Sequence, residues 1–113
     1  MSKTVRTNFD RHEARRDRRY ALPPIKVTFA EGEFTTENWS LGGFLLPLAA
    51  ALTRGTRFCG ELALATGRAP HAFAAEVVRR NSDGIGCRFI EPSPELVDAL
   101  DRAILGRLLR RPA

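Results

Sequence analysis

The sequence predicts a small, mainly β domain, an antiparallel barrel or sandwich with one helix at its C-terminal end. Three observations support this fold class. Apolar and polar residues alternate with a period of two in several short segments, which is typical of half-buried strands. Turn-forming clusters of Gly, Asn, Asp and Pro separate these segments at intervals of about 8–12 residues. The last part of the chain changes to helical spacing, and a length of 113 residues allows a single hydrophobic core.

The alternating segments predict six strands. The first is the segment from Ile25 to Phe29, and Pro23 and Pro24 before it exclude a helix there because proline disfavours the helical conformation in the preceding residue. We expect the strands at residues 25–29, 34–39, 44–46, 57–65, 73–80 and 85–90. The segments between them have the composition of turns and short connectors.

The final element is a helix that begins after Pro92. Ser93 has the side chain of an N-cap, and Pro94 suits the first helical position, where its missing N–H costs nothing. Apolar residues then recur on one side of the helix, namely Leu96, Leu100, Ala103, Ile104 and Leu108. We expect this side to pack on the strands.

The net charge of +5 is concentrated at the two ends of the chain. Residues 1–20 contain seven Lys/Arg against three Asp/Glu, and residues 101–113 contain four against one, so the middle of the chain has a charge of −2. Proteins that bind duplex nucleic acid usually spread positive charge over a folded face, so this distribution favours a local anion site and argues against nucleic acid. We expect residues 1–20 to form a flexible basic arm and residues 21–113 to form the folded domain.

Several classes of function find no support in the sequence. His12 and His71 have no acid or nucleophile spaced as in a catalytic triad, no Cys/His pair has metal-ligand spacing, and no glycine-rich loop matches a nucleotide-triphosphate site. We therefore expect neither an enzyme nor a resident metal or cofactor. The sequence shows no membrane span and no signal peptide, which predicts a cytoplasmic protein with Cys59 and Cys87 as small buried side chains.

The arginines near the N-terminus are a candidate anion site. Arg15, Arg16, Arg18 and Arg19 fill four of five positions, with no lysine among them. A guanidinium fits a phosphate or the O6/N7 edge of guanine with two hydrogen bonds and can stack on a base, whereas lysine offers only a point charge. The alternative is a solvated basic arm.

A second candidate lies at the corner that follows the predicted strand 34–39. Asn38 and Ser40 are two residues apart, so in a strand they face the same side while Trp39 faces the other. Gly42 and Gly43 permit positive φ and a close backbone approach of a ligand. The alternative is a β-turn with a local Asn/Ser cap.

Together these motifs resemble the paired signature of PilZ domains, which are bacterial receptors for cyclic di-GMP. The resemblance rests on Arg15-x-x-x-Arg19, a strand, and then Asn38-x-Ser40-x-x-Gly43. The segment from Gly84 to Phe89 also resembles the last strand of that family, and the similarity extends over about residues 11–105.

The resemblance implies a six-stranded antiparallel β-barrel with a C-terminal helix, and cyclic di-GMP as the ligand. It implies that Arg15 and Arg19 contact phosphates and guanine edges, with Arg16 and Arg18 as auxiliary contacts. Asn38 and Ser40 would bind a guanine, and Gly43 would let the backbone approach it. Asn38 departs from the commoner Asp, which accepts from both N–H donors of a guanine edge.

This family implies signalling through an arm that becomes ordered on the ligand and is then read by a downstream protein partner. Two alternatives remain open at the level of sequence. The first is a protein-interaction module of the same fold that binds no nucleotide. The second is a small barrel that binds nucleic acid through its basic arm, with an affinity that falls steeply as salt is added.

Overall fold

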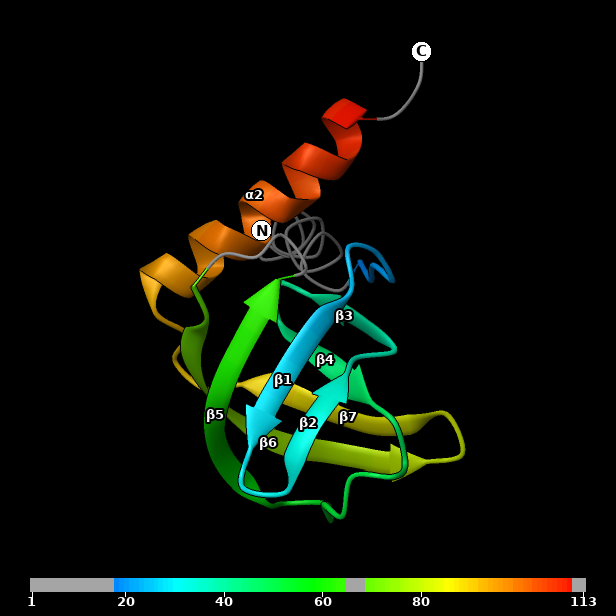
Figure 1. Cartoon of the computed structure of the whole chain (residues 1–113). Coiled ribbons are helices and arrows are strands. Elements are labelled where there is room, and N and C mark those ends of the chain that lie inside the picture. Colours follow the sequence, from blue (N-terminus) through cyan, green and yellow to red (C-terminus); the bar gives the residue numbers. More distant parts are fainter. Residues whose placement is uncertain (1–17, 65–68, 111–113) are drawn as a thin grey trace, which may run out of the picture.

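The computed structural model is one antiparallel sheet that curls into a barrel-like shape, with a helix along one end (Figure 1). The structure describes residues 18–64 and 69–110, the last four of them by their backbone alone. The strands are β1 (Ile25–Phe29), β2 (Gly32–Thr35), β3 (Asn38–Ser40), β4 (Gly43–Leu46), β5 (Arg57–Leu64), β6 (His71–Asn81) and β7 (Gly84–Phe89). Their order in the sheet is β2-β1-β5-β6-β7-β4-β3. The predicted mainly β barrel is confirmed.

Seven strands replace the six expected because the segment predicted at 34–39 bends between Thr35 and Asn38. The N–H of Thr36 donates to the carbonyl of Ile25 on β1 at 2.9 Å, and the next N–H, of Glu37, donates to Leu45 on β4 at 2.8 Å. The chain therefore changes its pairing partner at this bend. Since β2 and β3 are the two edges of the sheet, the bend also draws those edges together.

The core lies on the inner face of the curled sheet. Trp39, Phe44, Cys87 and Val77 occupy directly paired positions on β3, β4, β7 and β6, and all four are buried. The ring centroid of Phe44 lies 5.4 Å from that of Phe73, in the edge-to-face arrangement that is energetically favourable for a pair of aromatic rings. The residues on either side of this row must face outward, since side chains alternate along a strand.

The two cysteines differ in their environment. Cys87 is buried, as predicted, but the same prediction for Cys59 is wrong, because that residue is exposed. On β5 the buried Leu62 faces the core, so Cys59, three positions earlier, shares the outer face with Glu61. Burial raises the pKa of the Cys87 thiol to about 12, because the thiolate would lose its hydration.

Helix α2 (Pro94–Arg110) begins as the sequence predicts. The Ser93 hydroxyl accepts a hydrogen bond from the N–H of Leu96 at 3.1 Å, so Ser93 is the N-cap. Leu96 and Leu100 are fully buried and anchor the first half of the helix on the barrel, whereas its C-terminal end projects beyond the sheet (Figure 1). Leu108 lies outside the residues whose side chains are described. Within the described ranges, no helix is both long and apolar enough to cross a membrane.

Candidate ligand-binding site

The segment before β1 is attached to β3 at Tyr20. The N–H of Tyr20 donates to the carbonyl of Trp39 at 2.7 Å, and the N–H of Trp39 donates to the carbonyl of Tyr20 at 2.9 Å. The two rings lie 5.3 Å apart between centroids, and the indole N–H of Trp39 donates to the Pro23 carbonyl at 2.8 Å. Tyr20 thus sits directly against the strand that bears the second motif, and the residue before it emerges beside that strand.

This attachment brings one residue of each motif into contact. A guanidinium nitrogen of Arg19, Nη1, donates to Oδ1 of Asn38 at 3.1 Å, across 19 positions of sequence. Arg19 and Arg18 are exposed, and Asn38 is half-buried. Arg15 and Arg16 lie outside the described residues, as does most of the predicted arm. Of the predicted site, the structure brings together Arg19 and Asn38, and Ser40 lies two positions further along the same strand.

The corner after β3 is closed by the Ser40 side chain. Its hydroxyl accepts a hydrogen bond from the N–H of Gly42 at 3.1 Å, and only 5% of Ser40 is exposed. This is the local turn cap that the sequence left open as an alternative. The prediction that Trp39 faces away from Asn38 is confirmed, because Trp39 is fully buried in the core. Within the described ranges the Ser40 hydroxyl accepts this one hydrogen bond and donates to no group.

The glycines of the corner have a different role from the one expected. Neither Gly42 nor Gly43 has positive φ, which occurs instead at Gly32, Gly55 and Gly84. A Cβ on Gly43 would lie only 1.9 Å from the carbonyl oxygen of Cys87 on β7. Because Gly43 has no side chain, the backbone of β7 can pass close to the backbone of β4. The glycine is not needed here for an unusual φ. A Cβ on Gly42 would meet nothing nearer than 3.8 Å.

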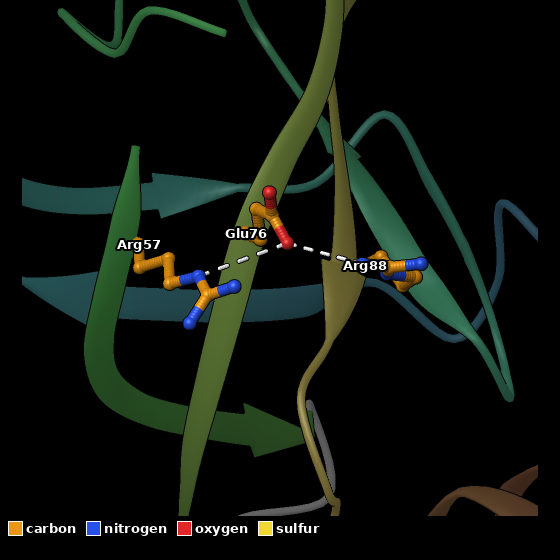
Figure 2. A network of polar contacts seen from close by, with 3 residues as sticks. All are labelled: Arg57, Glu76 and Arg88. Atoms are coloured by element: carbon orange, nitrogen blue, oxygen red, sulfur yellow. Dashed lines mark hydrogen bonds and ion pairs between the residues drawn. The ribbon is translucent and has the colours of Figure 1, made fainter. Parts of the chain in front are cut away.

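A row of outward-facing residues extends from this corner across the sheet. Pairing registers align Ser40 with Gly43, Gly43 with Arg88, Arg88 with Glu76, and Glu76 with Arg57. Nη2 of Arg88 donates to Oε1 of Glu76 at 3.0 Å, and Nε of Arg57 lies 3.9 Å from the same oxygen. Figure 2 shows Glu76 between the two arginines on neighbouring strands. We name Arg57, Glu76 and Arg88 the outer triad.

Comparison with known protein families decides the identity of the fold. A family model described as the PilZ domain matches residues 10–106, which includes both motifs and the whole sheet. The chain belongs to the PilZ family. PilZ domains are non-catalytic, which agrees with the prediction that this chain is not an enzyme. A search of curated protein sequences finds no significant match.

Solved structures agree with the PilZ assignment. YcgR from Escherichia coli, in a crystal structure with c-di-GMP, is 27% identical, with a TM-score of 0.58, over 82% of this chain and 46% of that one. The Bacillus subtilis inhibitor of motility MotI/DgrA matches at 20% identity and TM-score 0.60, over 83% and 51% of the two chains. The PilZ domain of CeSA from a cellulose-synthesizing bacterium matches at 16% and 0.53, over 81% and 99%. This PilZ chain spans about half the length of YcgR and MotI/DgrA.

The sequence does not show that the outer triad lies in one row with the corner of this PilZ domain. Arg88 was noted only as part of the predicted last strand, and nothing in the sequence aligns it with Gly43. That alignment depends on the register between β4 and β7, and the alignment with Glu76 depends on a register shift on β6 between Val77 and Arg79. Only the paired strands bring these residues into one row.

Proposed function

We propose that this chain is a cyclic di-GMP receptor of the PilZ type. The observation that supports this most is the contact between Arg19 and Asn38, because it joins the arginine motif and the corner motif at one edge of the sheet. The 27% identical YcgR, crystallised with c-di-GMP, supports the same ligand. The proposed site consists of Arg15, Arg19, Asn38, Ser40 and Gly43, with Arg16 and Arg18 as auxiliary residues.

The chemistry of these groups suits a ligand with two negative phosphates and two guanines. Arg19 has five N–H donors, and its bond to Asn38 uses only one of them. The remaining donors can form paired hydrogen bonds with a phosphate or with the O6/N7 edge of guanine. Asn38 supplies an amide donor and acceptor beside that guanidinium, and the Ser40 hydroxyl, two positions along β3, supplies a donor. Gly43 acts indirectly in this proposal, because it keeps β4 and β7 close enough to form the corner.

Signalling then depends on the arm. In this proposal residues 1–20 are an arm that becomes ordered around the ligand from its attachment at Tyr20, and residues 21–113 are the domain that presents the corner. The paired backbone of Tyr20 and Trp39 provides a fixed point from which the arm can fold over the site. Ordering the arm costs conformational entropy, so several charge-assisted hydrogen bonds are needed to offset it. The changed surface would be read by a downstream protein partner.

Calorimetric titration of cyclic di-GMP into the whole chain tests this function. We expect binding by the wild type and a loss of about tenfold or more in Arg19→Ala, because a charged hydrogen-bond donor is removed. Arg102→Ala is the matched control, since Arg102 is also an exposed arginine but lies on α2 and not on the sheet. Absence of binding by the wild type, or equal affinities of Arg19→Ala and Arg102→Ala, would contradict the proposal.

A further inference from the structure

We infer that Arg88 is a further ligand-binding residue of this site and that Glu76 positions it. Arg88 would contact the part of the cyclic dinucleotide that extends from Asn38 and Ser40 across β4. The inference rests on the proposed function and extends its site from the arm and the corner onto β7. The PilZ motif residues named above do not include it.

Strand register places Arg88 on the correct face. Residues directly opposite one another in antiparallel strands point to the same side of the sheet. Ser40 is paired with Gly43, and Gly43 with Arg88, whereas the adjoining row of Trp39, Phe44 and Cys87 faces the core. Arg88 therefore faces outward with the corner motif.

The separation suits one small ligand. Neighbouring strands lie about 4.8 Å apart, so the backbones at Ser40 and Arg88, two strands apart, are about 10 Å from each other. The residue between them is Gly43, which has no side chain that could stand between the two. A ligand that contacts Asn38 and Ser40 can thus extend over β4 and reach the guanidinium of Arg88.

Within the outer triad, Glu76 holds Arg88 in place and leaves other N–H donors of its guanidinium unused. One of its guanidinium nitrogens donates to Glu76 at 3.0 Å, while the side chain remains 64% exposed. Glu76 is only 22% exposed and also lies near Arg57, so one carboxylate is shared by two guanidinium groups. The triad keeps a net positive charge, which favours a doubly anionic ligand. Because exposed ion pairs contribute little to stability, the contact serves better to orient Arg88 than to hold the sheet together.

The atoms that Arg88 would bind form a planar pair of acceptors. Two groups of the ligand present such a pair, the phosphate oxygens and the O6/N7 edge of the second guanine. Lysine can replace arginine at a phosphate as a point charge, but it cannot form the paired bonds to guanine. The Arg88→Lys variant therefore distinguishes these two contacts. Near-normal affinity indicates that Arg88 binds a phosphate, and a loss as large as that of Arg88→Ala indicates that it binds the guanine edge.

The test is a calorimetric titration of cyclic di-GMP into the full chain and its Arg88→Ala, Arg88→Lys and Arg102→Ala variants. Arg102 is the matched control, because it is also an exposed arginine that lies 3.0 Å from a carboxylate, that of Asp98, but it lies on α2 and outside the outer triad. We expect Arg88→Ala to weaken binding about tenfold, because the bond that it removes is charged but exposed, and Arg102→Ala to stay within about twofold of the wild type. Urea unfolding followed by Trp39 fluorescence checks that each variant is folded. If the wild type binds and Arg88→Ala binds equally well, or if Arg102→Ala loses as much affinity, this inference is overturned while the proposed function stands. If the wild type does not bind, both are overturned.

Discussion

Replacing Gly43 with alanine should lower the free energy of unfolding, an effect that is separate from any effect on ligand binding. The new Cβ would lie 1.9 Å from the Cys87 carbonyl oxygen and 3.0 Å from the Cα of Arg88, both backbone atoms of β7. To reach 3.0 Å, the shortest separation that real Cβ atoms show, β4 and β7 would have to move apart by about 1 Å. Neither strand can yield by rotating a side chain.

The cost follows from what that movement disturbs. Overpacking in a close-packed region costs about 1–3 kcal/mol, and each weakened backbone hydrogen bond near the site adds up to about 1 kcal/mol. The pairing of Phe44 with Cys87 and the bond from the N–H of Phe89 to the Gly42 carbonyl are the nearest ones. We expect Gly43→Ala to lower the free energy of unfolding by about 3 kcal/mol, which for this size corresponds to a fall in Tm of roughly 12 °C.

Urea unfolding followed by tryptophan fluorescence measures this loss. Trp39 is the only tryptophan in the sequence and is fully buried, so its emission reports the unfolding of the core directly. Gly42→Ala is the matched control, because its Cβ would meet nothing nearer than 3.8 Å, and we expect it to stay within about 0.5 kcal/mol of the wild type. Equal unfolding midpoints for the two variants would refute the reasoning.

Three further predictions concern other parts of the molecule. Because the Cys87 pKa is raised from 9.0 to about 12, only the unfolded chain loses this thiol proton above pH 9, so stability falls as pH rises through 9–12. The wild type should lose about 1 kcal/mol more than Cys87→Ala between pH 8 and pH 10 in urea unfolding, and equal losses would contradict this. The Arg80 guanidinium donates to the carbonyls of Leu52 at 2.8 Å and Ala50 at 3.2 Å, so Arg80→Ala should cost about 1–2 kcal/mol in the same assay; an unchanged midpoint would disprove that role. Asn38→Asp should bind cyclic di-GMP several-fold more tightly, as judged by calorimetry, because a carboxylate can accept from both N–H donors of a guanine edge; unchanged or weaker binding would count against the assigned contact.

The sequence predicts most of the fold because its local signals agree with one another. Alternation and turn composition locate the strands, and Ser93 and Pro94 locate the start of the helix, since these features act over only a few residues. The bend at Thr36 and Glu37 is not visible in this way. It arises because the chain exchanges one pairing partner for another, and that depends on strands distant in sequence.

The same distinction separates the predicted and unpredicted parts of the site. Asn38 and Ser40 form a recognisable local pattern, and the family resemblance implies that they share one site with the arginines. The structure places Arg19 in contact with Asn38. The positive φ expected at Gly43 does not occur, and the constraint on this glycine is the backbone of β7, more than 40 positions later. The outer triad was missed for the same reason, since register between strands aligns Arg88 with the corner.

A double-mutant cycle in the affinity for cyclic di-GMP tests most directly whether the arm and the corner form one binding site. Calorimetry on the wild type, Arg19→Ala, Asn38→Ala and the double variant gives the four affinities required. We expect binding by the wild type, a loss of about tenfold in each single variant, and a loss in the double variant clearly smaller than the product, because the two side chains contact each other and the same ligand. Losses that simply multiply, or a wild type that does not bind, would contradict a composite site.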